Sequence, residues 1–283
     1  MTDDTSTVIQ RRRLRFELRA AREHAGLTQG QAASAMDWSS SKIIRIEAGA
    51  VNISTNDIRA LLRYYKVDPS RLKELTELAR EARKQPWTNK YRNVAAADFL
   101  KFVEYESAAS IRREFDHLRI PGLLQTEEYA HAIAPHYVQE DRVQGLVEVR
   151  MRRQELLNRK SSKAPLLFFI LDEAVVHRHM GSPAILRRQI RHLLEMTKPS
   201  LTIEIVPFSA GPHSAMDRPF VILEFPDPAD RDILYLESSE GDELSEDSAK
   251  VLRYREAFEE LRDISLGPEG SYAYLDTLSK EMA

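Results

Sequence analysis

The sequence predicts a multi-domain protein, with an N-terminal all-α domain of five helices over residues 1–85 and a C-terminal α/β domain over residues 86–283. In residues 9–84, apolar residues recur at helical spacing between closely spaced turn signals, whereas strand-like apolar runs occur only from residue 165 onward. The charge divides in the same way, because residues 1–85 carry a net charge of +5 and the rest of the chain a net charge of −8. A basic domain on an acidic body suggests that the first domain binds a polyanion, although chance clustering of charge gives the same imbalance.

Helix caps and stops define the five helices of the N-terminal domain. The first is expected near residues 10–25, and capping residues precede the other four. The caps are Thr28, Ser39, Ser54 and Asp68, with helix-ending signals at Gly26, Gly49 and Pro86. Gln31 stands three residues after Thr28, which is the spacing of a capping box. Five short helices with tight turns between them form a small all-α domain.

The C-terminal domain mixes helical and strand patterns, which predicts a mixed sheet with helices packed on it. We expect helices at 98–118 and 139–159, a short helix opened by Thr126, a helix from Ser182 to about residue 197, and a final helix at 246–264. The expected strands are the apolar runs at 165–171, 201–208, 219–225 and 232–238.

Composition and motifs argue against several function classes. The chain has no cysteine, which excludes disulfides, thiolate nucleophiles and cysteine-ligated zinc, and fits the cytoplasm. The N-terminus lacks the apolar segment of a signal peptide, and the longest strongly apolar run (165–171) is too short to cross a bilayer, so we expect a cytoplasmic protein without a membrane anchor. No phosphate-binding loop, dinucleotide fingerprint, zinc-protease motif or nucleophile elbow is present, so we predict no enzyme activity and no cofactor. His177 and His179 lie two apart in an expected strand, but they lack a supporting third ligand, so we predict no metal site.

The predicted third helix, which begins after Ser39, has one face without acidic residues. At about 100° per residue, this arc carries Ser40, Ser41, Ile44 and Arg45. Ile43 and Ile46 point to the opposite side. Arginine can bind guanine with two hydrogen bonds, serines can donate or accept, and an aliphatic side chain can contact the thymine methyl group. Two helices joined by a short turn, the second with such a face, describe a helix-turn-helix that reads double-stranded DNA in the major groove.

The segment GLTQGQAASAMDWSSSKIIRIEAG (26–49) is similar to the five-helix, phage-repressor-like (Xre-type) DNA-binding domain. The whole chain resembles actinobacterial transcriptional regulators that join this domain to a shared C-terminal domain of unknown function, on the segments IPGLLQTEEYA, LDEAVVHR, VPFSAGPH and YLES. The resemblance implies that Gln29 contacts phosphate, that the serines and Arg45 approach bases, and that Arg22 and Glu47 pair to fix the recognition helix. The candidate DNA-binding residues are Gln29, Ser39, Ser40, Ser41, Lys42, Ile44 and Arg45. Relatives carry a small polar residue at the position of Ile44, whose side chain either contacts a thymine methyl group or folds against the core.

The C-terminal domain leaves two interpretations open. His213 lies in a glycine- and proline-containing segment (208–220) and is a candidate, with Glu173 and Arg178, for a ligand pocket, although a rigid connector with a hydrogen-bonded histidine also explains the segment. The resemblance alternatively implies an antitoxin-like protein that sequesters a small partner protein encoded nearby and regulates its own operon. In either case one recognition helix contacts too little DNA for high specificity, so we expect a homodimer on an operator with two half-sites, with residues 123–149 as a candidate dimer interface.

Overall fold

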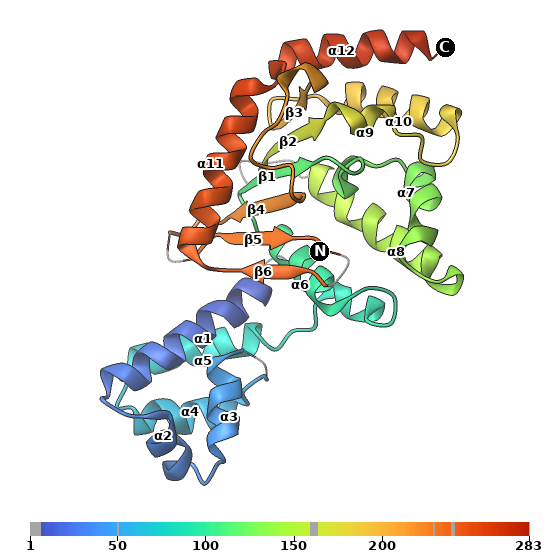
Figure 1. Ribbon diagram of the computed structural model, residues 1–283. Helices are drawn as coiled ribbons and strands as arrows, with labels where there is room; N and C mark the ends of the chain where they lie inside the picture. The colour runs from blue at the N-terminus through green and yellow to red at the C-terminus, as the bar shows by residue number, and fades with distance from the viewer. Residues whose placement is uncertain (1–6, 50, 159–163, 229, 239–240, 283) are drawn as a thin grey trace. The chain divides into compact units, whose positions relative to one another are not determined.

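The structure is a computed structural model that describes residues 7–49, 51–158, 164–228, 230–238 and 241–282 (Figure 1). The chain divides into two compact units, residues 1–89 and 90–283. The boundary expected after residue 85 falls just before the 3-10 helix Trp87–Tyr91, in the stretch that follows the last long helix of the first unit.

The first unit is helical throughout its regular structure, which confirms the predicted fold. Its α-helices are α1 (Thr7–His24), α2 (Gln29–Ala35), α3 (Ser40–Glu47), α4 (Thr55–Tyr64) and α5 (Pro69–Glu81). The side chains of Thr28 and Gln31 form a complete capping box at the start of α2. Ser39, Ser54 and Asp68 likewise accept hydrogen bonds from backbone N–H groups in the first turns of α3, α4 and α5. The helix starts are therefore fixed by short-range contacts that can be read from the sequence.

The second unit contains a six-stranded mixed sheet, as the sequence predicts, with the strand order β3-β2-β1-β4-β5-β6 among the described residues. The strands are β1 (Ile111–Asp116), β2 (Leu166–Asp172), β3 (Leu201–Val206), β4 (Phe220–Glu224), β5 (Ile233–Leu236) and β6 (Glu243–Ser245). β2 pairs in parallel with β1 and β3, and β4, β5 and β6 continue from β1 in antiparallel pairs. The carboxyl ends of β1, β2 and β3 thus lie at the same end of the sheet, where open sheets commonly bind ligands.

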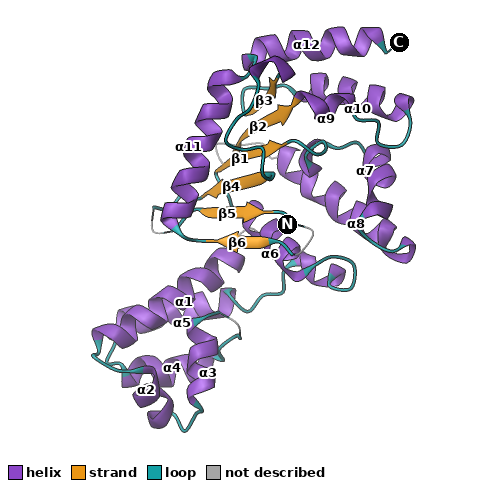
Figure 2. Cartoon of the chain, in the orientation of Figure 1, coloured by secondary structure: helices purple, strands orange, loops and turns teal. Residues whose placement is uncertain are grey.

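Helices flank this sheet (Figure 2). They are α6 (Ala97–Glu106), α7 (Glu127–Ile133), α8 (Glu140–Arg153), α9 (Glu173–His177), α10 (Pro183–Met196), α11 (Ser248–Ile264) and α12 (Gly267–Glu281). α11 packs on one face, where Phe258 joins Phe115 and other strand residues in an apolar cluster. α10 and α12 contribute Ile190 and Leu275 to a second cluster, which contains Phe169 and other side chains from β2 and β3.

The prediction of a single helix over 98–118 is wrong. α6 ends at Glu106, and the chain then forms β1, which lies between β2 and β4 in the sheet. Arg112 and Glu114 are buried on one face of β1, where they form ion pairs; Arg112 also pairs with Glu106, which in turn binds Arg153. Because charged residues occupy buried positions in this strand, the sequence lacks the alternation of apolar and polar residues by which a strand is recognised.

Three further expectations about the second unit need correction. The helix expected at 246–264 is α11, but it is not the last, because α12 begins at Gly267, which has a left-handed φ of 66°. β6 was not predicted, since three residues are too few to show a pattern. The apolar side chains expected to form a dimer interface over 123–149 are largely internal: Leu124 and Tyr129 are fully buried in the unit's own core.

Candidate nucleic-acid interface

The acid-free face of α3 points to solvent. Ile43 and Ile46 are buried in the core of the first unit, at 0% and 4% exposure. The exposed residues on the other side are Ser40, Ser41, Ile44 and Arg45. Ile44 is 48% exposed, so its side chain projects outward and does not fold against the core. Within the described residues the Arg45 guanidinium has no ion-pair or hydrogen-bond partner, which leaves it free to bind an external group.

A buried ion pair joins the helices that position α3. Arg22 of α1 donates from Nε and Nη2 to the two carboxylate oxygens of Glu47, at 2.6 Å and 3.0 Å. It also donates from Nη1 to the Leu27 carbonyl oxygen at 2.7 Å. Gln29, the first residue of α2, donates from Nε2 to Glu47 Oε2 at 2.9 Å. Glu47 is the one acid of α3, and its charge is buried and paired, so the exposed face stays free of negative charge.

The turn between α2 and α3 fixes where α3 begins. Asp37 has a φ of 53°, in the left-handed region that non-glycine residues seldom adopt. Ser39 Oγ accepts from the backbone N–H of Lys42 at 3.3 Å. The Lys42 amine lies 3.5 Å from the centroid of the Trp38 ring and 3.4 Å from the Asp57 carboxylate. Ser39 and Lys42 therefore already have partners within the domain, as Gln29 does.

The residues expected to form a ligand pocket in the second unit do not come together. Glu173 accepts hydrogen bonds from the Tyr274 hydroxyl at 2.8 Å and from the Phe208 backbone N–H at 2.6 Å. His213 instead has its Nε2 atom 4.0 Å from Asp172 Oδ2, and Arg178 is exposed. The reason is local: β2 ends at Asp172 and α9 begins at Glu173, so the two neighbouring carboxylates are directed to different partners.

Comparisons with known families agree with this architecture. Residues 99–277, more than half of the chain, match the family described as a domain of unknown function (DUF5753). The chain belongs to the DUF5753 family. Residues 13–75 match the family described as a helix-turn-helix domain, which indicates a DNA-binding regulator. No curated protein and no solved structure matches the chain.

In the DUF5753 domain, sequence reasoning missed the residues that surround His213. His117 follows β1 directly, and Asp172 ends β2, so both lie with His213 near the carboxyl ends of the parallel strands. The Phe115 ring meets the His213 ring edge-on, with 5.4 Å between centroids. Burial lowers the pKa of His117, and the Nδ1 atoms of both histidines are buried without a hydrogen-bond partner among the described residues. Recognising β1 in the sequence would have made His117 a candidate site residue, since polar residues that follow parallel strands gather at the carboxyl ends of those strands.

The other pair of histidines in the DUF5753 domain does not lie in a strand. His177 is the last residue of α9, and its Nε2 atom is 2.7 Å from the Tyr274 hydroxyl. In the part of the chain that the structure describes, no three His, Asp or Glu side chains are placed to bind a metal ion together. None of the described helices is both long enough and apolar enough to cross a membrane.

Proposed function

We propose that the chain is a sequence-specific, Xre-type DNA-binding transcriptional regulator that reads the major groove with α3. The observation that carries the proposal is the exposed face of α3, which offers hydroxyls, an aliphatic side chain and an unpaired guanidinium while its one acid is buried. Arg45, Ser40 and Ser41 contact base edges, and Ile44 contacts a thymine methyl group. Gln29 binds phosphate through the amide hydrogen that Glu47 does not use, while the ion pair of Arg22 with Glu47 holds α3 at its angle.

The length of α3 implies that two copies bind together. Eight residues span about 12 Å at about 1.5 Å per residue, so one α3 covers a single half-site. We therefore assign dimerisation and the sensing of an effector to the second unit, and no catalytic role. A homodimer would place two recognition helices about one helical turn apart on an operator with two half-sites.

Footprinting on genomic DNA with the full-length protein identifies the operator, and single-site variants then test the division of roles. Arg45→Ala should weaken operator binding by about 1–3 kcal/mol and relax discrimination at one base position. Arg63→Ala is a matched control, because Arg63 is an exposed arginine of the same domain that lies on α4. Gln29→Ala should weaken binding to all sequences alike. Equal, sequence-independent losses for the Arg45 and Gln29 variants would contradict the proposal.

A second candidate function, sequestration of a small partner protein, is favoured by one observation. Phe208 and Met216 are 62% and 60% exposed in the segment 208–220, and aromatic and methionine side chains are enriched at protein interfaces. Copurification of a small protein encoded nearby, lost on Phe208→Ser, would favour this function. Release of operator DNA by a small molecule in the absence of any second protein would favour the effector-sensing regulator.

A further inference from the structure

β3 is an edge strand, and its outer side is only partly closed. The backbone of Leu167 in β2 donates to the Ser200 carbonyl, so the even-numbered residues of β3 bond to β2. Because backbone hydrogen-bonding directions alternate along a strand, Leu201, Ile203 and Ile205 turn their N–H and C=O groups to the open edge. The N–H and C=O groups of these three residues are therefore the ones available for hydrogen bonds at this edge of the sheet.

Two of the three residues are satisfied by the chain itself. Leu201 exchanges hydrogen bonds with Lys198, as donor at 2.8 Å and as acceptor at 3.4 Å. Ile205 donates to Ser271 Oγ at 2.8 Å and accepts from the Leu266 backbone N–H at 2.9 Å. Ile203, between them, has no such outer partner among the described residues, although it is only 6% exposed. The Ile203 N–H and C=O groups are therefore free to form hydrogen bonds with a molecule from outside the chain, either water or a ligand.

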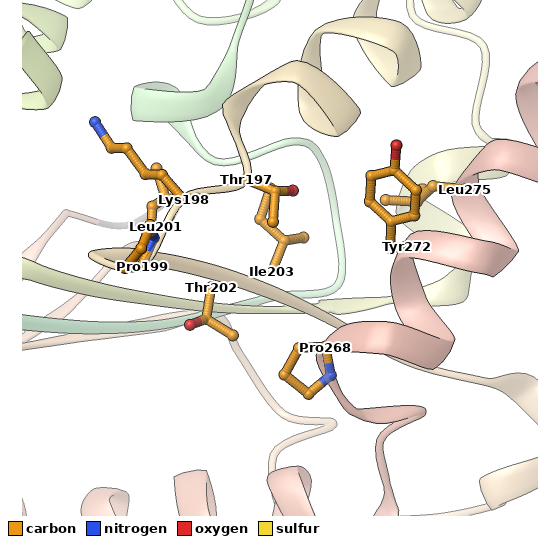
Figure 3. A pocket seen from close by; sticks show the side chains of 9 residues that line it. All are labelled: Thr197, Lys198, Pro199, Leu201, Thr202, Ile203, Pro268, Tyr272 and Leu275. Carbon is orange, nitrogen blue, oxygen red and sulfur yellow. The ribbon is translucent and has the colours of Figure 1, made fainter.

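A pocket of about 270 Å³ opens at this unpaired position (Figure 3). Its lining residues are Thr197, Lys198, Pro199, Leu201, Thr202, Ile203, Pro268, Tyr272 and Leu275. Thr202 and Ile203 have side chains on opposite faces of the strand, so the pocket lies along the strand edge and not over one face. The Tyr272 ring and the two prolines provide apolar walls, and Tyr272 is 47% exposed at the rim.

The charges of the lining favour an uncharged ligand. No Asp or Glu lines the pocket. Its one cation, the Lys198 amine, donates to the Leu157 carbonyl oxygen at 2.5 Å, and in Figure 3 the Lys198 side chain extends away from Tyr272. The polar groups left to recognise a ligand are the Ile203 backbone pair and the hydroxyls of Thr197, Thr202 and Tyr272.

We propose that this pocket binds a small uncharged molecule that presents a hydrogen-bond acceptor and donor to the backbone N–H and C=O of Ile203, as one amino-acid residue does across an antiparallel pair. An acylated amino-acid amide with an aliphatic side chain has this chemistry, and its apolar part meets Pro199, Pro268 and the Tyr272 ring. The volume lies just below the range of about 300–1,000 Å³ that holds drug-sized ligands, which suits a molecule of one or two residues.

A strand from a partner protein does not fit the same edge. Strand addition needs several successive outward-facing residues with unpaired backbone groups. Here the outward-facing neighbours of Ile203 are already paired, Leu201 with Lys198 and Ile205 with Ser271 and Leu266. This inference deepens the effector sensing assigned above and rests on it for the link to regulation. Binding itself is measured without DNA, so its failure would leave the role of α3 untouched.

Titration calorimetry on the full-length, DNA-free protein tests the pocket with N-acetyl-L-leucinamide as the probe. We expect saturable binding, and binding about tenfold weaker for the analogue methylated on the leucine nitrogen, which lacks the donor to the Ile203 carbonyl. Tyr272→Ala should weaken binding of the probe about tenfold, because it removes an apolar wall of the pocket, and the exposed position of Tyr272 should let the variant fold normally. Tyr64→Ala is the matched control, a tyrosine of similar exposure (40%) on α4, and should leave probe affinity unchanged.

Amide hydrogen exchange gives a readout that needs no variant. In the free protein the Ile203 amide should exchange at least about tenfold faster than that of Glu204, which bonds to β2, and the probe should slow the Ile203 amide selectively. Equal protection of the two amides in the free protein would overturn the inference, since the pair would then be satisfied internally. Absence of probe binding, or equal binding of the methylated analogue, would overturn it as well.

Discussion

Replacing Glu47 by leucine tests how far the first unit depends on its buried ion pair. The Arg22 and Glu47 side chains are 9% and 6% exposed, and the carboxylate accepts three hydrogen bonds, two from Arg22 and one from Gln29. Removing one partner of a buried pair costs about 3–5 kcal/mol, because the other charge stays buried alone. Arg22 keeps its bond to the Leu27 carbonyl and lies 3.5 Å from Glu23, so we expect the lower end, about 3 kcal/mol.

Urea unfolding of the full-length protein, followed by tryptophan fluorescence, isolates this effect. Both tryptophans, Trp38 and Trp87, belong to the first unit, so the signal reports its unfolding and not that of the sheet. The double variant Arg22→Met with Glu47→Leu removes both charges and should recover most of the loss, since apolar replacements of a whole buried pair are often neutral. Glu77→Ala is the surface control, because its ion pair with Arg80 on α5 is exposed and should contribute little.

Two results would refute this reasoning. The first is a Glu47→Leu variant that is no less stable than the Glu77→Ala control. The second is a double variant as unstable as the single one, because the loss would then come from packing and not from an uncompensated charge.

Three other substitutions test particular features. Asp37→Gly should raise the unfolding free energy of the first unit by roughly 0.5–1 kcal/mol, because glycine adopts the left-handed turn without strain; the urea midpoint measures it. Tyr65→Phe should leave that midpoint unchanged or raise it, since the Tyr65 hydroxyl is buried without a hydrogen-bond partner among the described residues, and a clear loss would contradict this. Burial raises the pKa of Asp116 from 3.8 to about 7, so its contribution to the stability of the second unit is full below about pH 4 and is lost as the pH rises to about 7. Asp116→Asn should abolish this loss of stability between pH 5 and pH 8, measured by calorimetric unfolding. An equal loss in the variant and in the unsubstituted protein would contradict the assignment.

The first unit could be predicted almost completely because its signals are local. Each of the caps Thr28, Ser39 and Ser54 bonds to a backbone group three residues away, so a short window of sequence contains the whole interaction. The exposed face of α3 follows in the same way from helical periodicity and two buried isoleucines. The contact of Gln29 with Glu47 was not predicted, because it joins residues 18 apart and depends on how α2 meets α3.

The second unit shows where such reasoning ends. Continuous apolar runs predict strands such as β2, whereas the pattern over 98–118 predicts a helix where the structure has β1. Without β1, the sequence gives no reason to place His117 beside His213, and the predicted partner Glu173 already accepts hydrogen bonds from Tyr274 and Phe208. The pocket beside Ile203 could not be predicted either, because it depends on a turn and a later helix that leave one edge residue unpaired.

The charged residues of β1 also disfavour a shifted register. Arg112 and Glu114 point to one face, where Glu106 binds both Arg112 and Arg153, while Phe115 points to the apolar cluster under α11. A slip of one residue would turn both charges into that cluster and the phenylalanine into the ion network, at a cost of several kcal/mol for each unpaired charge. Apolar residues at these positions would give comparable stability but would tolerate either face more readily. We infer that the ion network favours this pairing of β1 with β2 and β4, which brings His117, Asp172 and His213 together at the carboxyl ends of the parallel strands.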